Sequence, residues 1–122
     1  MIQIGKILQI DFDGTIVEDK FPRIGKFMPE AVETLIDLRK AGYILLLNTN
    51  RTAHYLDEAV KHCELHSIEF DAVNDHFSGF ATLFPEIEKL GERSRKLWYD
   101  YSIDDKDIKG FCGWRKVREI LL

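Results

Sequence analysis

The stretch Ile7-Leu-Gln-Ile-Asp-Phe-Asp-Gly-Thr15 decides the fold of this chain. Its apolar half is short, partly β-branched and bounded by an Asp-Gly turn signal, which indicates a buried strand over 7–10. Asp11 and Asp13 therefore follow the carboxyl end of a strand, where open α/β sheets place their ligands. A carboxylate there can bind a hard cation such as Mg²⁺, or attack phosphorus and become an aspartyl phosphate. The alternative reading is a solvated turn, because Asp-Gly is a common turn dipeptide.

The composition indicates a single globular domain and disfavours several other classes. A chain of 122 residues is long enough for one core and too short for two, and 45% hydrophobic residues exclude a disordered chain. The net charge of −4, from 17 basic and 21 acidic residues, gives no preference for nucleic acid. Cys63 and Cys112 form no Cys-x-x-Cys pair, so we expect neither a zinc site nor a disulfide framework.

The amino terminus lacks the long apolar core of a signal peptide, and no apolar segment approaches the roughly 20 residues that cross a bilayer. We therefore expect no membrane association and a cytoplasmic location.

Helical and extended patterns alternate along the rest of the chain. Residues 16–28 read as an extended loop or a small hairpin. Apolar spacing, helix-start prolines and glycine stops predict helices over 29–41, about 53–65 and 114–122, with a short one over 85–90. Apolar runs predict further strands over 43–47, 68–73 and 97–103. This order predicts an α/β fold, a three-layer Rossmann-like arrangement with a parallel, doubly wound sheet.

Polar residues follow three of the predicted strands, and parallel strands release them at one edge of the sheet. Hydrolysis of a phosphate monoester needs a nucleophile, an acid for the leaving oxygen and a cation for the phosphoryl charge. We predict Asp11 as the nucleophile and Asp13 as the general acid and base. Asp11, the main-chain carbonyl of Asp13 and a carboxylate of the Asp104–Asp105 pair would hold Mg²⁺.

Further side chains could contact the phosphoryl group or the rest of a substrate. Thr49 offers a hydroxyl donor, although a strand-ending threonine is also common without any function. Lys96 could neutralise a phosphoryl oxygen, although most lysines are only surface charges. The remaining candidate substrate contacts are Gly14, Thr15, Asn50, Arg51 and Arg23, and each arginine could equally form a surface ion pair.

Four segments together resemble a known family. Asp11-Phe-Asp-Gly-Thr15 resembles the first motif of the haloacid dehalogenase (HAD) superfamily, and Leu45-Leu-Leu-Asn-Thr49 resembles the second. Lys96 matches the lysine of the third motif, and Tyr101-Ser-Ile-Asp-Asp105 resembles the fourth in its double-aspartate form. The motifs stand in the family's order and cover nearly the whole chain. The resemblance implies that Asp105 ligates the metal and that Asp104 supports it.

The chain is similar to small, cap-less bacterial HAD hydrolases in the segments Asp13-Gly-Thr-Ile-Val-Glu18, Pro22-Arg-Ile-Gly25 and Ile103-Asp-Asp-Lys106. Larger HAD enzymes insert a cap domain after the first motif or between the second and third motifs, and neither gap of this chain has room for one. We therefore expect one core domain over 1–122 and a Mg²⁺-dependent phosphatase that forms an aspartyl phosphate. The expected partner is a phosphorylated small molecule, with residues 16–28 or another subunit of a homo-oligomer covering the open site. The alternatives are a receiver-like phospho-acceptor or metal-binding signalling module, and a HAD-type phosphotransferase. Residues 74–95 depart most from the family.

Overall fold

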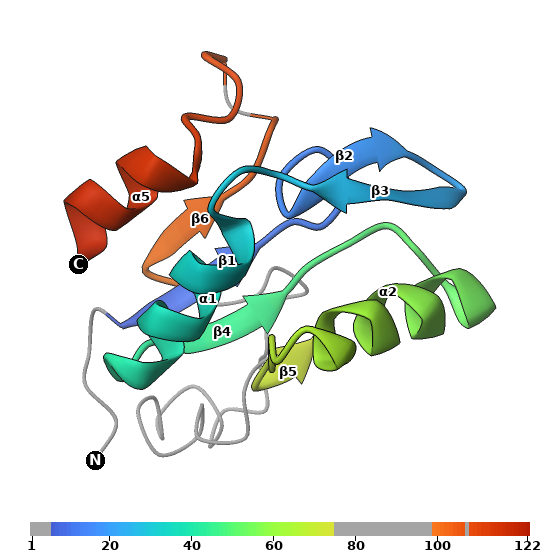
Figure 1. Ribbon diagram of the computed structural model, residues 1–122, viewed down its shortest axis with the longest axis horizontal. Coiled ribbons are helices and arrows are strands. Elements are labelled where there is room, and N and C mark those ends of the chain that lie inside the picture. Colours follow the sequence, from blue (N-terminus) through green and yellow to red (C-terminus); the bar gives the residue numbers. More distant parts are fainter. Residues whose placement is uncertain (1–5, 75–98, 107) are drawn as a thin grey trace, which may run out of the picture.

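Four parallel strands form the sheet that positions the candidate site (Figure 1). The computed structural model describes residues 6–74, 99–106 and 108–122. The sheet has the order β5-β4-β1-β6, and each neighbouring pair in it is parallel. Its strands are β1 (Ile7–Ile10), β4 (Ile44–Leu47), β5 (Ala72–Val73) and β6 (Tyr101–Ile103). The predicted α/β class with a parallel sheet is confirmed, and the arrangement is consistent with a Rossmann-like fold.

The core follows from the alternation of side chains along the strands. Leu8 and Ile10 of β1 lie in the main buried cluster, whereas Ile7 belongs to a second, smaller cluster with Leu46 of β4. Successive residues of a strand point to opposite faces, so apolar runs such as 44–47 supply both clusters. Continuous apolar runs are what a parallel sheet covered on both faces requires.

The described part of the chain contains three helices, α1 (Ala31–Lys40), α2 (Ala53–Leu65) and α5 (Trp114–Leu121), and α1 contacts α5. The prediction that Pro29 opens the first helix is wrong. Glu30 has φ 64°, in the left-handed region, so the helix begins only after it. None of these helices has the length and apolarity of a membrane-spanning segment.

Two predicted strands are shorter than the apolar runs that indicated them. The strand expected over 68–73 is reduced to β5, because the Asp71 carboxylate accepts the Leu45 N–H at 2.8 Å and replaces a ladder bond. The strand expected over 97–103 is shorter too: residues 99–100 precede β6 without belonging to it, and the Asp100 carboxylate accepts the Ile7 N–H at 2.9 Å. Residues 97–98 lie outside the described residues.

Residues 16–28 form the small hairpin that was one of the two predicted outcomes. Strands β2 (Val17–Lys20) and β3 (Arg23–Phe27) pair antiparallel and lie at the carboxyl end of the sheet (Figure 1). The described chain between β1 and β4 contains only this hairpin and α1, so no cap domain is inserted there. Part of the segment between the second and third motifs, the short helix predicted over 85–90 and Lys96 lie outside the described residues.

Trp114 ties the last helix to the loop after β1. Its side chain is 1% exposed, and its Nε1–H donates to the Thr15 carbonyl at 2.8 Å. We expect Trp114→Ala to lower the free energy of unfolding by about 3–5 kcal/mol, because it leaves a large cavity. Trp114→Phe should cost less, about 1–3 kcal/mol, chiefly for the unpaired carbonyl. Urea denaturation measures both, with the exposed Leu65→Ala as a control that should change little.

Candidate active site

The three polar loops begin at the same level of the sheet. Ile10 is in register with Leu47 on one side and with Ile103 on the other. The Asp11 N–H continues the ladder to the Ile103 carbonyl at 3.0 Å, and the Asn48 N–H donates to the Ile10 carbonyl at 2.8 Å. The segments that carry the acids and Thr49 therefore leave the sheet side by side, as the sequence predicted.

Asp11 and Asp105 form the electrostatic centre of this edge. Burial raises the pKa of Asp11 most, and a hydrogen bond with Asp105 and the charges of Asp105 and Asp104 raise it further, from 3.8 to about 7. The Thr15 hydroxyl donates to Asp11 Oδ2 over a long 3.4 Å. The metal-free site therefore disfavours the fully ionised pair, because two close carboxylates repel each other.

Asp105 is held tightly against the turn after β1. Gly14 has φ 83°, and a Cβ built on it would stand 2.1 Å from Asp105 Oδ2. Asp105 Oδ1 is buried and finds no hydrogen-bond donor among the described residues, while Oδ2 lies 4.0 Å from the exposed amine of Lys106. A buried carboxylate oxygen without a donor is costly unless a cation satisfies it.

This donor set fits Mg²⁺. In the described part of the chain, no group of three His, Cys, Asp or Glu side chains could hold a metal ion. Mg²⁺ needs fewer, because it binds through one or two carboxylates and completes its octahedron with waters and phosphate oxygens. Asp11, Asp105 and the main-chain carbonyl of Asp13 would supply the protein ligands.

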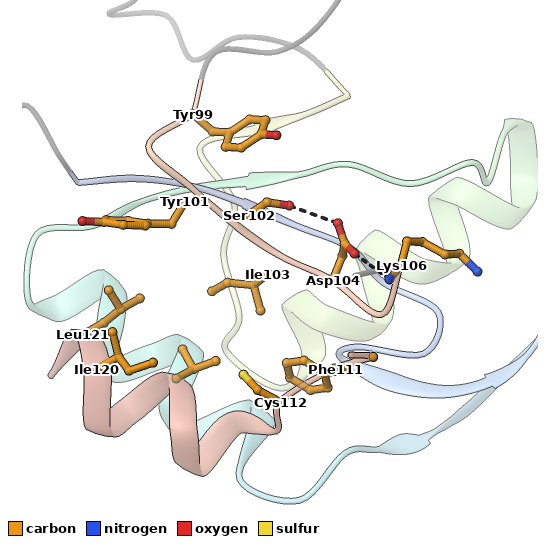
Figure 2. A pocket seen from close by; sticks show the side chains of 12 residues that line it. Tyr99, Tyr101, Ser102, Ile103, Asp104, Lys106, Phe111, Cys112, Ile120 and Leu121 are labelled. Atoms are coloured by element: carbon orange, nitrogen blue, oxygen red, sulfur yellow. Dashed lines mark hydrogen bonds between the residues drawn. The ribbon is translucent and has the colours of Figure 1, made fainter. Parts of the chain in front are cut away.

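Asp104 has a different environment from Asp105. Its Oδ1 accepts the Lys106 N–H at 2.6 Å, and its Oδ2 accepts the Ser102 hydroxyl at 3.0 Å (Figure 2). Asp104 therefore connects the end of β6 to the loop after it. The sequence prediction named Asp104 among the metal residues, and the structure assigns it these two loop contacts.

We expect Asp105→Ala to weaken Mg²⁺ binding more than Asp104→Ala, by about tenfold or more. Asp105 interacts with Asp11 and has a buried oxygen without a donor among the described residues, whereas both Asp104 oxygens accept hydrogen bonds from the protein. Isothermal titration of Mg²⁺ into both variants measures the difference. The reverse ranking would exchange the roles of the two acids.

The raised pKa of Asp11 predicts a pH-dependent response to metal. The folded, metal-free protein keeps a proton on Asp11 up to about pH 7, whereas the unfolded chain loses it near 3.8. This group therefore makes the metal-free fold less stable as pH rises from about 4 to about 7. Because Mg²⁺ competes with that proton, the rise in melting temperature on adding Mg²⁺ should be larger at pH 8 than at pH 6. Equal rises in thermal melts at the two values would contradict this prediction.

Thr49 lies in a short turn between β4 and α2. Its Oγ1 accepts the Arg51 N–H at 3.2 Å, and its own N–H donates to Asn74 Oδ1 at 2.8 Å. The hydroxyl hydrogen is not used in these contacts and can donate to an anion. Asn50 beside it is exposed. Their predicted roles toward substrate remain predictions.

Gly14 and Thr15 were predicted to contact substrate, and the backbone N–H groups of both residues donate hydrogen bonds to nearby carbonyls. The Gly14 N–H donates to the Val17 carbonyl at 2.8 Å, and the Thr15 N–H to the Phe12 carbonyl at 3.2 Å. These bonds fix the shape of the turn that carries Asp11. The close approach at Gly14 is made by the Asp105 carboxylate.

The two candidate arginines lie in different environments. Arg23 in β3 is exposed, and its contact with substrate remains a prediction. Arg51 is 2% exposed and forms an ion pair with Asp13, with Nε 2.8 Å from Oδ2. Arg51 does form an ion pair, which was the alternative prediction. The pair does not lie at the surface, however, because the Arg51 side chain is buried. The sequence predicted that Arg51 and Asp13 lie at this edge of the sheet, but it did not predict that they contact each other.

A cavity of about 530 Å³ lies between β6 and α5 (Figure 2). Apolar and aromatic side chains such as Tyr101, Phe111 and Leu121 line much of it. Asp104 lines it too, but neither Asp11 nor Asp105 does. Asp11 and Asp105 are therefore separate from this cavity, and the chemistry predicted for them from the sequence remains a prediction.

Solved structures include a protein similar to this chain over most of its length. A conserved protein from Bacteroides thetaiotaomicron is 38% identical, with a TM-score of 0.80 over 93% of this chain and 87% of that chain. A 3-deoxy-D-manno-octulosonate 8-phosphate phosphatase from Moraxella catarrhalis, solved with magnesium, phosphate and KDO, is 18% identical over 96% of this chain and 85% of that one. Its TM-score of 0.45 is too low to establish a shared fold. No family model and no curated protein matches the chain.

Proposed function

We propose that this chain, which belongs to the same family as the conserved Bacteroides thetaiotaomicron protein, is a HAD-type, Mg²⁺-dependent phosphatase. The observation that carries the proposal is the contact between Asp11 and Asp105 at the ends of neighbouring strands. A half-buried carboxylate with a raised pKa, beside a second carboxylate that has one buried oxygen without a donor among the described residues, is costly in a purely structural role. The Asp-x-Asp-Gly-Thr loop around them supports the HAD assignment.

Asp11 is the proposed nucleophile. Its carboxylate oxygen forms a bond to phosphorus, the bond from phosphorus to the leaving oxygen breaks, and Asp13 gives that oxygen a proton. Asp13 then takes a proton from water, whose oxygen attacks the phosphorus of the aspartyl phosphate. Inorganic phosphate leaves and the Asp11 carboxylate is restored.

The other residues support these two steps. Thr49 donates its hydroxyl hydrogen to a phosphoryl oxygen, and Lys96, by its match to the third motif, neutralises another. When bound by Asp11, Asp105 and the Asp13 carbonyl, Mg²⁺ neutralises phosphoryl charge and offsets the repulsion between the acids. The proposed substrate class is a phosphorylated small molecule, because the net charge gives nucleic acid no advantage.

The test is release of inorganic phosphate by the purified protein. A panel of phosphorylated metabolites and an aryl phosphate is incubated with Mg²⁺, with EDTA in a parallel set. We expect Mg²⁺-dependent release from at least one compound and none with EDTA. Absence of release from the whole panel would refute the hydrolase. Transfer to an added alcohol without release would favour the phosphotransferase.

A further inference from the structure

Arg51 links three parts of the chain through one guanidinium group. Its Nε and Nη2 donate to the two carboxylate oxygens of Asp13, each at 2.8 Å. Its Nη2 also donates to the Arg23 carbonyl at 2.9 Å, and its Nη1 to the Pro22 carbonyl at 3.2 Å. The acceptors belong to the loop after β1 and to the tip of the β2–β3 hairpin.

Two aromatic rings enclose the same group. The guanidinium carbon lies 5.2 Å from the centre of the Phe12 ring and 5.0 Å from that of the Phe21 ring. Phe12 is fully buried beside the acids, whereas Phe21 at the hairpin tip is 53% exposed. Cation–π attraction on both sides adds to the hydrogen bonds and excludes water from the group.

The geometry leaves little capacity for a substrate anion. A guanidinium carries five N–H donors in a planar fork, and four hydrogen bonds to protein acceptors already use most of them. A buried charge also requires a partner, and Asp13 provides it. One Nη1–H remains, so Arg51 could bind a substrate anion through two donors only by releasing Asp13 or a hairpin carbonyl.

We propose that Arg51 is a positioning residue that fixes the orientation of the Asp13 carboxylate and couples it to the tip of the β2–β3 hairpin. This inference rests on the proposed function, in which Asp13 transfers the proton. Because both Asp13 oxygens are held by the group that binds the Pro22 and Arg23 carbonyls, a displaced hairpin tip also displaces Asp13. The hairpin therefore belongs to the acid–base apparatus, although it contributes no reacting group.

Hydrogen exchange tests the coupling without any assay of activity. In Arg51→Lys the charge remains but the planar fork is lost, and in Asp13→Asn the ion pair is lost. We expect both variants to increase amide exchange over 17–27 by about fivefold or more, while exchange in β4 is unchanged. Arg115→Lys is the matched control, because Arg115 makes a similar two-point contact with Glu30 at the surface. Unchanged exchange over 17–27 in Arg51→Lys would overturn the coupling.

Kinetics separate positioning from substrate binding. A misplaced Asp13 matters most when the leaving oxygen needs a proton, so Arg51→Lys should lower kcat about tenfold or more for an alkyl phosphate. It should lower kcat much less for an aryl phosphate, with KM for both within about threefold of the wild type. A raised KM with an unchanged kcat would mean that Arg51 binds substrate and would overturn the proposal. Equal losses of kcat for both substrates would overturn it too, since they indicate a purely structural role.

The two experiments also distinguish this inference from the proposed function. If the wild-type protein releases no phosphate from any substrate, the phosphatase assignment fails, and with it the proton-transfer role of Asp13. The exchange experiment would still decide whether Arg51 couples Asp13 to the hairpin. If the wild type is active and exchange over 17–27 is insensitive to Arg51→Lys, only the positioning role fails.

Discussion

Asp11→Asn is expected to reduce Mg²⁺-dependent phosphate release by at least about 10³-fold, the largest effect of any single substitution in this chain. An amide oxygen at this position cannot form the acyl phosphate through which the proposed reaction passes. An aryl phosphate is the most sensitive substrate for the measurement, because its leaving group needs little protonation. Turnover at the wild-type rate by a folded variant would refute the assignment of Asp11 as nucleophile.

The same substitution supplies its own control for folding. Burial and Asp105 raise the pKa of Asp11 to about 7, so above that pH the ionised Asp11 opposes folding of the metal-free protein. Asn carries no charge, and the metal-free variant should therefore melt at pH 8 at a temperature equal to or above that of the wild type. Circular dichroism and thermal melts without Mg²⁺ check this. A lower melting temperature would show that Asp11 is needed for the fold.

The sheet could be predicted from the sequence because its strands are short apolar runs with clear ends. The runs over 7–10 and 43–47 are each followed by polar turn residues, and the structure places β1 and β4 there. The helix over 53–65 was predicted with the bounds that α2 has. The strand predicted over 68–73 is shorter in the structure. The Asp71 side chain accepts the hydrogen bond from the Leu45 N–H that a backbone carbonyl of a longer strand would have accepted.

The contacts that organise the site could not be predicted, because they join residues far apart in the chain. Arg51 meets Asp13 across 38 positions, and Trp114 meets Thr15 across 99. The sequence placed Arg51 near the site as a candidate substrate contact or a surface ion pair, since nothing local reveals that its partner is Asp13. The double acid after β6 was visible too, but only the packing against Gly14 shows that Asp105 is the one facing Asp11.

Gly14→Ala should damage the metal site more than the fold. The added Cβ would lie 2.1 Å from Asp105 Oδ2 and 2.8 Å from its carboxyl carbon. These atoms end a side chain that can rotate, so the carboxylate moves away and the backbone is largely spared. We expect Mg²⁺ affinity to fall by about 10–100-fold and phosphatase activity to fall with it. Isothermal titration and phosphate release measure the two losses.

Gly42→Ala is the matched control for this prediction. Gly42, in the turn between α1 and β4, has φ 95° beside the 83° of Gly14, so both alanines are strained to a similar degree of about 1 kcal/mol. A Cβ at Gly42 would meet no atom within 4 Å, whereas the one at Gly14 meets the carboxylate of Asp105. The two variants should therefore lose similar stability in urea, and only Gly14→Ala should lose Mg²⁺ binding. Equal Mg²⁺ affinity in both would mean that Asp105, in the position it has here, does not hold the metal.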